Sequence, residues 1–241
     1  DIVASDLPSS ATELNLKLTL VYVQSDGSGT SIPNNGTKLV NVVSGDGTQL
    51  GNEICISDEC FYVISSTDST VTMLSKYNLY VGGEYNSGWT AYGDEATGIQ
   101  DSTMLGYVSG QTIRKGTTKF SNTNYWSSTV SSYPTYVYDS NSTLYSYVEN
   151  YKTYLSTLGV TPSEARLITK EELEGLGCSS SSKSCSSAPS WVYETSYWSG
   201  SAYDTEFVWR VFSTGSFNSY DYSYDLIYGC RPVITISRSL I

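Results

Sequence analysis

The stretch that decides the fold is WVYETSYWSGSAYDTEFVWRVFSTGSFNSYDYSYDLIYGCRPVITISRSLI, residues 191–241. Two kinds of sequence are interleaved in it. One kind is typical of a scaffold, with Trp198, Gly215, Arg231 and the alternating run at 233–236. The other kind is dense in Tyr, Ser, Asp and Asn, above all over residues 216–225. Tyr offers large rigid contact area and small polar residues offer adaptable hydrogen bonds, as recognition loops require. The stretch therefore predicts a binding surface on a rigid frame.

The run Val208-Trp209-Arg210-Val211-Phe212 predicts a strand that separates this frame from the surface. Successive side chains of a strand point to opposite faces, so Trp209 and Val211 share one face. With Trp209 in the core, Arg210 and Phe212 face outward beside the tyrosine-rich loop. An ordinary hairpin with a polar loop is the alternative, because Tyr also has a high strand propensity.

The proposed binding surface gathers polar and aromatic side chains between residues 203 and 228. Its aromatic rings are expected to supply apolar contact and stacking, and its charged groups to set a charge preference, with Tyr228 at the edge. Arg231 is expected beneath it, bonded to backbone carbonyls. The ligand-binding residues are Tyr203, Asp204, Glu206, Arg210, Phe212, Thr214, Asn218, Tyr220, Asp221, Tyr222, Tyr224, Asp225 and Tyr228.

Composition and charge exclude several classes of function. The 241 residues carry a formal net charge of -11, which argues against nucleic acid and anionic membranes as partners. There is no histidine, so the commonest general base and most zinc sites are excluded. Charged residues make up only 15% of the chain, and 22 Tyr stand against 5 Phe, as in secreted or surface proteins. We expect no catalytic residue, no metal and no cofactor.

Four of the five cysteines form two local pairs. A two-residue turn at 57–58 would set Cys55 opposite Cys60 in a non-hydrogen-bonded pair, whose close spacing suits a disulfide. Cys178 and Cys185 bracket a serine-rich loop that a second disulfide would close. Two disulfides indicate an oxidising compartment, so we expect an extracellular, cell-surface or virion-surface location. Four reduced thiols are the alternative, and a zinc site is disfavoured because the tight two-residue spacing is missing.

The remaining cysteine and the ends of the chain leave alternatives open. Cys230 is either a buried small apolar residue or a free thiol near the binding surface. No segment is long enough to span a bilayer, and no signal peptide is visible. Because the chain begins at Asp1, we expect that an anchor or leader has been removed. The protein would then contact a membrane only through that anchor.

The chain before residue 191 predicts strands first and helices later. Residues 14–22 alternate apolar and polar side chains, and the runs at 38–43 and 70–75 are typical of further strands. Residues 1–48 are expected to form a β-rich N-terminal segment or small domain. The Leu and Tyr spacing over about 142–158 predicts a core-facing helix that Gly159 ends.

A second helix is predicted by the capping box Thr169-Lys170-Glu171-Glu172. The negative charges of the glutamates in this first turn interact favourably with the positive end of the helix dipole. We prefer this structural role to an acid–base or metal site.

Four segments carry a resemblance to a known family: ARLITKEEL at 165–173, YWSGS at 197–201, Val208-Trp209 and GCRPV at 229–233. The order of these segments resembles that in proteins with the C-type lectin fold in its formylglycine-generating-enzyme-like form. It also resembles surface or phage-borne proteins of gut Firmicutes and the variable proteins of diversity-generating retroelements. The resemblance covers about residues 51–241.

The resemblance implies an α+β fold over residues 49–241, with two helices and a small mixed or antiparallel sheet. It implies a variable-type region at about 197–230, where retroelement mutagenesis changes side chains that bind a protein or glycan on another cell or host surface. Ile168 stands where the enzyme branch has proline, and its catalytic cysteines have no counterpart, so that activity is not implied. The calcium signatures of sugar-binding C-type lectins are absent as well.

Two other functions compete with this interpretation. One is a structural pilin-like or phage tail subunit, whose C-terminal face would pack against neighbouring copies. The other is a carboxylate-based glycan-acting enzyme, which needs two carboxyl groups facing one cleft. Asp204 and Glu206 are the attractive pair for it, because on a strand they would share a face.

Overall fold

The computed structural model describes residues 40–57, 59–79, 83–84, 116–117, 120–122, 124–125, 134–221 and 228–241. Contacts divide the chain into two compact units, Asp1–Thr37 and Lys38–Ile241, and every described residue belongs to the second. The strand expected at 14–22 therefore lies outside the described residues. The division falls before the expected boundary at residue 48, because residues 40–42 already pair with the next strand.

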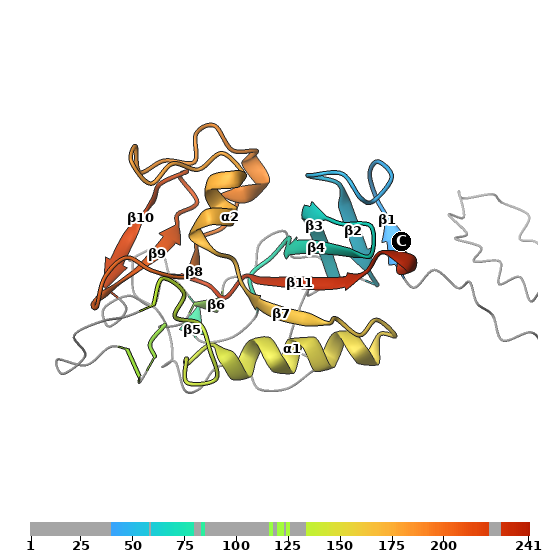
Figure 1. Ribbon diagram of the computed structural model, residues 1–241, viewed down its shortest axis with the longest axis horizontal. Helices are drawn as coiled ribbons and strands as arrows, with labels where there is room; N and C mark the ends of the chain where they lie inside the picture. Colours follow the sequence, from blue (N-terminus) through green and yellow to red (C-terminus); the bar gives the residue numbers. More distant parts are fainter. Residues whose placement is uncertain are drawn as a thin grey trace, which may run out of the picture. The chain divides into compact units, whose positions relative to one another are not determined.

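The second unit is an α+β structure built on a six-stranded antiparallel sheet (Figure 1). The strand order is β1-β2-β3-β4-β11-β7, so β11 lies between two strands that precede it in the chain. The expected strand at 70–75 and the expected C-terminal strand are confirmed. The bounds are β1 Val40–Val42, β2 Glu53–Ile56, β3 Glu59–Ser66, β4 Thr70–Ser75, β7 Glu164–Leu167 and β11 Pro232–Ser237.

The two faces of this sheet contact two separate hydrophobic clusters. Along β11, Ile234 and Ile236 belong to one cluster and Val233 to the other, as strand alternation requires. Helix α1, Tyr145–Thr157, packs in the first cluster, so the expected core-facing helix is confirmed. Gly159 follows it with a φ of 88°, a conformation that glycine adopts at little cost. The buried side chains of α1 are Tyr147, Val148, Tyr151 and Leu155.

The second cluster holds the short helix α2, Lys170–Gly175, and the second disulfide. The predicted capping box is present, with Thr169 accepting from the backbone of Glu172 and the Glu172 carboxylate accepting from the backbone of Thr169. Both predicted disulfides are also present, Cys55–Cys60 and Cys178–Cys185. Two disulfides are consistent with an extracellular protein.

A three-stranded antiparallel sheet, in the order β10-β9-β8, carries most of the proposed binding surface. Its strands are β8 Tyr197–Ala202, β9 Phe207–Val211 and β10 Phe217–Asp221. Single-turn helices occur at η3, Ser190–Val192, and η4, Arg238–Leu240, and a two-stranded ladder joins β5, Gly83–Glu84, to β6, Gly116–Thr117. Among the described residues, no helix is both long and apolar enough to cross a membrane.

Candidate ligand-binding site

The register of the three-stranded sheet fixes which side chains share a face. Arg210 of β9 lies opposite Trp198 of β8 and Asn218 of β10. Val211 lies opposite Tyr197 and Phe217 on the other face, and these three belong to the second hydrophobic cluster together with Trp209. The predicted separation of Trp209 and Val211 from Arg210 and Phe212 is therefore confirmed.

The face of Arg210 is less open than the alternation alone predicts. Trp198 and Val208 on this face are buried in the first hydrophobic cluster, and Phe212 packs against that cluster. The Arg210 guanidinium carbon lies 4.3 Å from the ring centroid of Tyr228. Both faces of β9 thus contact core, and Arg210 and Phe212 are half-buried.

Tyr228 itself lies in the interior, contrary to its expected place at the edge of the surface. Only 1% of its area is exposed, and its ring packs edge-on against Trp198 with centroids 4.8 Å apart. Gly229 pairs with the start of β8 and Cys230 accepts from the backbone N–H of Leu79, and these bonds hold the adjoining Tyr228 inside. Tyr228 therefore supports Arg210 from below and has no surface to offer a ligand.

The hairpin connections place the remaining predicted residues at two opposite ends of the sheet. Tyr203, Asp204 and Glu206 form the turn between β8 and β9. Asp221 at the end of β10 pairs with Phe207, so that end of β10 lies beside this turn. Thr214 lies in the turn between β9 and β10, at the far end of the five-residue β9 and about 15 Å away along the strand. A small ligand contacts only one of these ends, whereas a protein interface of ordinary size would cover both.

The β8–β9 turn displays an aromatic ring on a buried support. Tyr203 is 50% exposed, one of few large apolar side chains in the described part of the chain that face solvent. Its ring meets Trp209 edge-on, with centroids 5.4 Å apart and an interplanar angle of 74°, while Trp209 is only 6% exposed. The ring is therefore held at the surface by a residue that belongs to the core.

The two acidic residues of this turn have different roles. The Asp204 carboxylate accepts hydrogen bonds from the backbone N–H groups of Glu206 and Phe207, at 2.8 and 2.9 Å, and so closes the turn. Glu206 is exposed and forms no ion pair with any described residue. Both lie in the turn and not on a strand, so the shared strand face expected for an acid–base pair is wrong.

Sequence reasoning missed Lys170 as a member of this region. Its backbone N–H donates to the Ser201 hydroxyl at 2.9 Å, which docks the start of α2 on β8. Its ammonium lies 5.8 Å from the Trp209 ring centroid and pairs with Glu174 at 2.8 Å. The capping box predicted where α2 begins, but no local pattern predicted which strand it docks on.

Asn218 lies opposite Arg210 on the partly covered face of the sheet. Its side-chain oxygen is buried and has no hydrogen-bond partner among the residues that the structure describes. A buried acceptor without a partner costs free energy, which a donor from a bound molecule would recover. Tyr222, Tyr224 and Asp225 lie outside the described residues, and for Tyr220 and Asp221 only the backbone is described.

Arg231 forms the frame beneath these strands, as the sequence predicts. Its side chain is fully buried, and its nitrogens donate to the carbonyls of Ser75, Lys76, Trp191 and Val192. Burial lowers the pKa of this guanidinium. Its carbon also lies 4.9 Å from the ring centroid of Tyr197, and burial raises the pKa of that phenol to about 12. These contacts join β4 to η3 and to the start of the three-stranded sheet.

The second disulfide supports the opposite end of that sheet. Within its loop, Cys185 N–H donates to the carbonyl of Gly215, and Phe217 N–H donates to the carbonyl of Lys183. The loop therefore pairs with the β9–β10 turn and the first residue of β10. Cys230, the fifth cysteine, is fully buried in the first cluster, and burial raises its thiol pKa, so the buried alternative holds.

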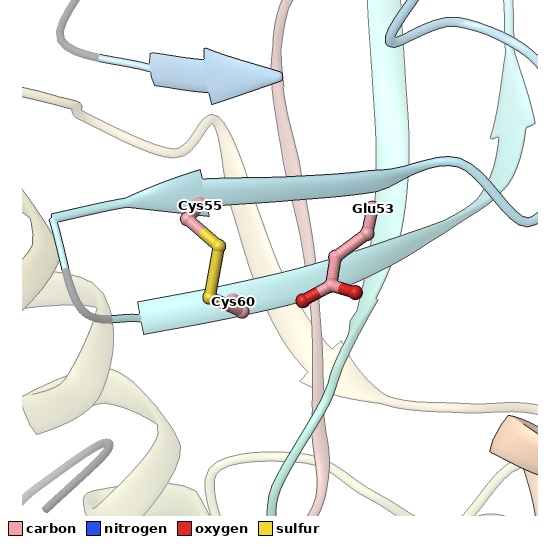
Figure 2. A group of neighbouring side chains, drawn as sticks. All are labelled: Glu53, Cys55 and Cys60. Atoms are coloured by element: carbon pink, nitrogen blue, oxygen red, sulfur yellow. A yellow bond between two sulfur atoms is a disulfide. The ribbon is translucent and has the colours of Figure 1, made fainter. Parts of the chain in front are cut away.

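One further group of side chains has the composition of a metal site. The carboxylate of Glu53 and the sulfurs of Cys55 and Cys60 lie within 4.8 Å of one another. Figure 2 shows the two sulfurs bonded across β2 and β3, with Glu53 on the same side of the hairpin. Glu53 also pairs with Lys76 at 2.7 Å. In the disulfide form the sulfurs have no thiolate charge to offer a cation.

No protein-family model, curated protein or solved structure matches this chain.

Proposed function

We propose that the chain is a surface-displayed ligand-binding protein of receptor or adhesin type, with a C-type lectin-like fold. Its C-terminal face binds a protein or glycan on another cell or host surface. The observation that carries the proposal is Tyr203, half exposed on a turn whose base, Trp209, is buried. An aromatic ring held in solvent contributes little to folding, and tyrosine is enriched at binding hot spots.

The fold proposal is supported by the arrangement of parts. Two helices accompany a sheet whose C-terminal strand is interior, and a separate small sheet presents the polar turns. The buried Arg231 joins the larger sheet to η3 through backbone carbonyls, and its guanidinium contacts the small sheet through the ring of Tyr197. Such a frame tolerates change in the displayed turn, which is what diversification by a retroelement requires.

We place the binding surface at the β8–β9 turn and the adjoining end of β10. Of the predicted residues it keeps Tyr203 and Glu206, together with Asp221, whose backbone lies beside this turn. Lys170 is added to them. Thr214 is left out because it lies at the other end of the sheet, and Tyr228 because it is buried. Asp204 remains as the residue that shapes the turn.

Binding of fluorescent tetramers of the chain to protein and glycan arrays tests the proposal. The double variant Tyr203→Ala/Glu206→Ala should lose more than about tenfold in apparent affinity for any array ligand, since a hot spot contributes about 2 kcal/mol or more. Its melting temperature should fall by no more than about 4 °C. Leu50→Ala is the matched control, because Leu50 is 60% exposed on a different loop. Retained binding with a large loss of stability would contradict the proposal.

Sibling genes provide an independent test of diversification. Aligned copies should differ at the codons for Tyr203, Glu206 and residues 218–225, and agree at Trp209 and Arg231. Copies that vary evenly over the whole of residues 197–230 would count against it.

A further inference from the structure

The β2–β3 hairpin brings three metal-binding groups together from one face of the sheet. Glu53 and Cys55 are two residues apart on β2, so their side chains point the same way. Cys60 lies directly opposite Cys55 on β3. The carboxylate and both sulfurs fall within 4.8 Å of one another (Figure 2).

Exposure distinguishes this disulfide from the other one. Cys60 and Glu53 are partly exposed, and Cys55 is 7% exposed. In the second disulfide, Cys185 is fully buried and Cys178 is 5% exposed within a hydrophobic cluster. Thiol–disulfide exchange depends on access to the sulfur attacked, so a reductant reaches Cys60 first.

We propose that Glu53, Cys55 and Cys60 form a redox-gated site for a thiophilic divalent cation of the zinc class. A reductant of the dithiol class breaks the S–S bond by exchange and leaves as its own cyclic disulfide. Its two protons remain on Cys55 and Cys60. The cation then displaces these protons, and two thiolates and one carboxylate bind it, with water in the fourth position. The hairpin is thus closed either by a disulfide or by a metal ion.

The donor set suits such an ion. Zinc takes thiolate and carboxylate ligands in tetrahedral sites, with the sulfurs at about 2.3 Å and oxygen at about 2.0–2.2 Å. The backbone pairing of Cys55 with Cys60 keeps both side chains beside each other after the S–S bond opens. Soft sulfur donors exclude magnesium and calcium, which prefer oxygen ligands.

Lys76 sets the strength of the site. Its ammonium lies 2.7 Å from a Glu53 carboxylate oxygen and neutralises the negative charge of that carboxylate. A metal cation would bind to the same negative charge. The incoming ion must displace this ammonium or share the carboxylate with it. Removing the ammonium should therefore raise metal affinity, while removing the carboxylate should lower it.

Cobalt(II) is the probe, because tetrahedral thiolate coordination gives it intense visible absorption. The chain is reduced with dithiothreitol, freed of it by anaerobic gel filtration and titrated with Co²⁺. We expect one Co²⁺ per reduced chain and none in the oxidised chain. Glu53→Gln should weaken binding by roughly tenfold or more, and Lys76→Met should strengthen it several-fold. Cys55→Ser/Cys60→Ser should abolish the absorption.

Three results would overturn the proposal. One is the absence of thiolate bands in the reduced chain. Another is their persistence in Cys55→Ser/Cys60→Ser, which would assign them to the remaining cysteines. The last is a reduced chain that has lost its near-ultraviolet circular dichroism and does not regain it with Co²⁺, because the site requires the β2–β3 ladder. None of these outcomes bears on the proposed binding surface.

Discussion

Replacing Arg231 by Met tests whether one buried guanidinium holds the frame together. The side chain is fully buried and donates to four backbone carbonyls from two distant segments. Methionine fills a similar volume and donates no hydrogen bond. The Ser75 carbonyl, bonded at 2.6 Å, and the Trp191 carbonyl, bonded at 2.9 Å, then lose these donors.

The magnitude follows from the cost of orphaned acceptors. Each buried carbonyl left without a partner costs about 1–3 kcal/mol. Val192 retains a donor, because the Tyr197 hydroxyl bonds its carbonyl at 2.7 Å. The replacement also removes the desolvation penalty of a buried charge, which offsets part of the loss. We expect a net loss of about 3–5 kcal/mol, or a fall in melting temperature of roughly 6–20 °C for a unit of this size.

Thermal and urea unfolding followed by circular dichroism measure this loss. Arg238→Met is the matched control, since the Arg238 guanidinium donates to the exposed Thr67 carbonyl at 3.0 Å and to no other group among the described residues. It should cost about 1 kcal/mol or less. A melting temperature for Arg231→Met within about 2 °C of the parent would show that the carbonyls are satisfied without the guanidinium and that Arg231 does not hold the frame together.

Three other changes probe the local structure. Burial alone would raise the pKa of Glu172, but its bonds from Arg166 and the helix cap hold that pKa below its usual value. Its stabilisation is thus present above about pH 4.3 and lost as the pH falls through the lowered pKa, so Glu172→Gln should flatten the acid limb of a stability–pH curve. Ser57→Gly should raise stability by about 0.5–1 kcal/mol in urea unfolding, because relief of the left-handed backbone at a φ of 55° exceeds the entropy that glycine adds to the unfolded chain. Gly229→Ala should lower the melting temperature, since its Cβ would clash with the Asn78 side-chain amide; an unchanged value would show that Asn78 moves aside.

Local patterns predicted much of the fold. The capping box at Thr169, the cysteine spacings and the alternation in β11 each depend on neighbours a few residues away. Such signals survive in a single sequence because the backbone geometry that they serve is local. Arg231 was also predicted, since a lone arginine beside a buried strand needs carbonyl partners.

The candidate site was predicted less completely. The alternation of side chains along a strand shows which residues share a face, but it does not show which other segments pack against that face. Both faces of β9 pack against core, and Tyr228 is buried on the face expected to be open. Asp204 and Thr214 flank the predicted strand at 208–212, so their separation already followed from that strand, although the predicted surface included both. The contact of Lys170 with Trp209 joins elements that no linear pattern relates.

The position of β11 has a consequence for how the chain is assembled. Among the described strands, β7 pairs with β11 alone, and β11 pairs with the edge of β4 that β3 leaves open. A growing polypeptide therefore holds β7 unpaired while the whole β8–β10 hairpin region is translated. The β8–β10 strands can pair early, because their contacts are between residues close in sequence. The large sheet is completed only when β11 pairs with the distant β4, so this should be the slow step. Mutations in the displayed turn would then leave that slow step untouched.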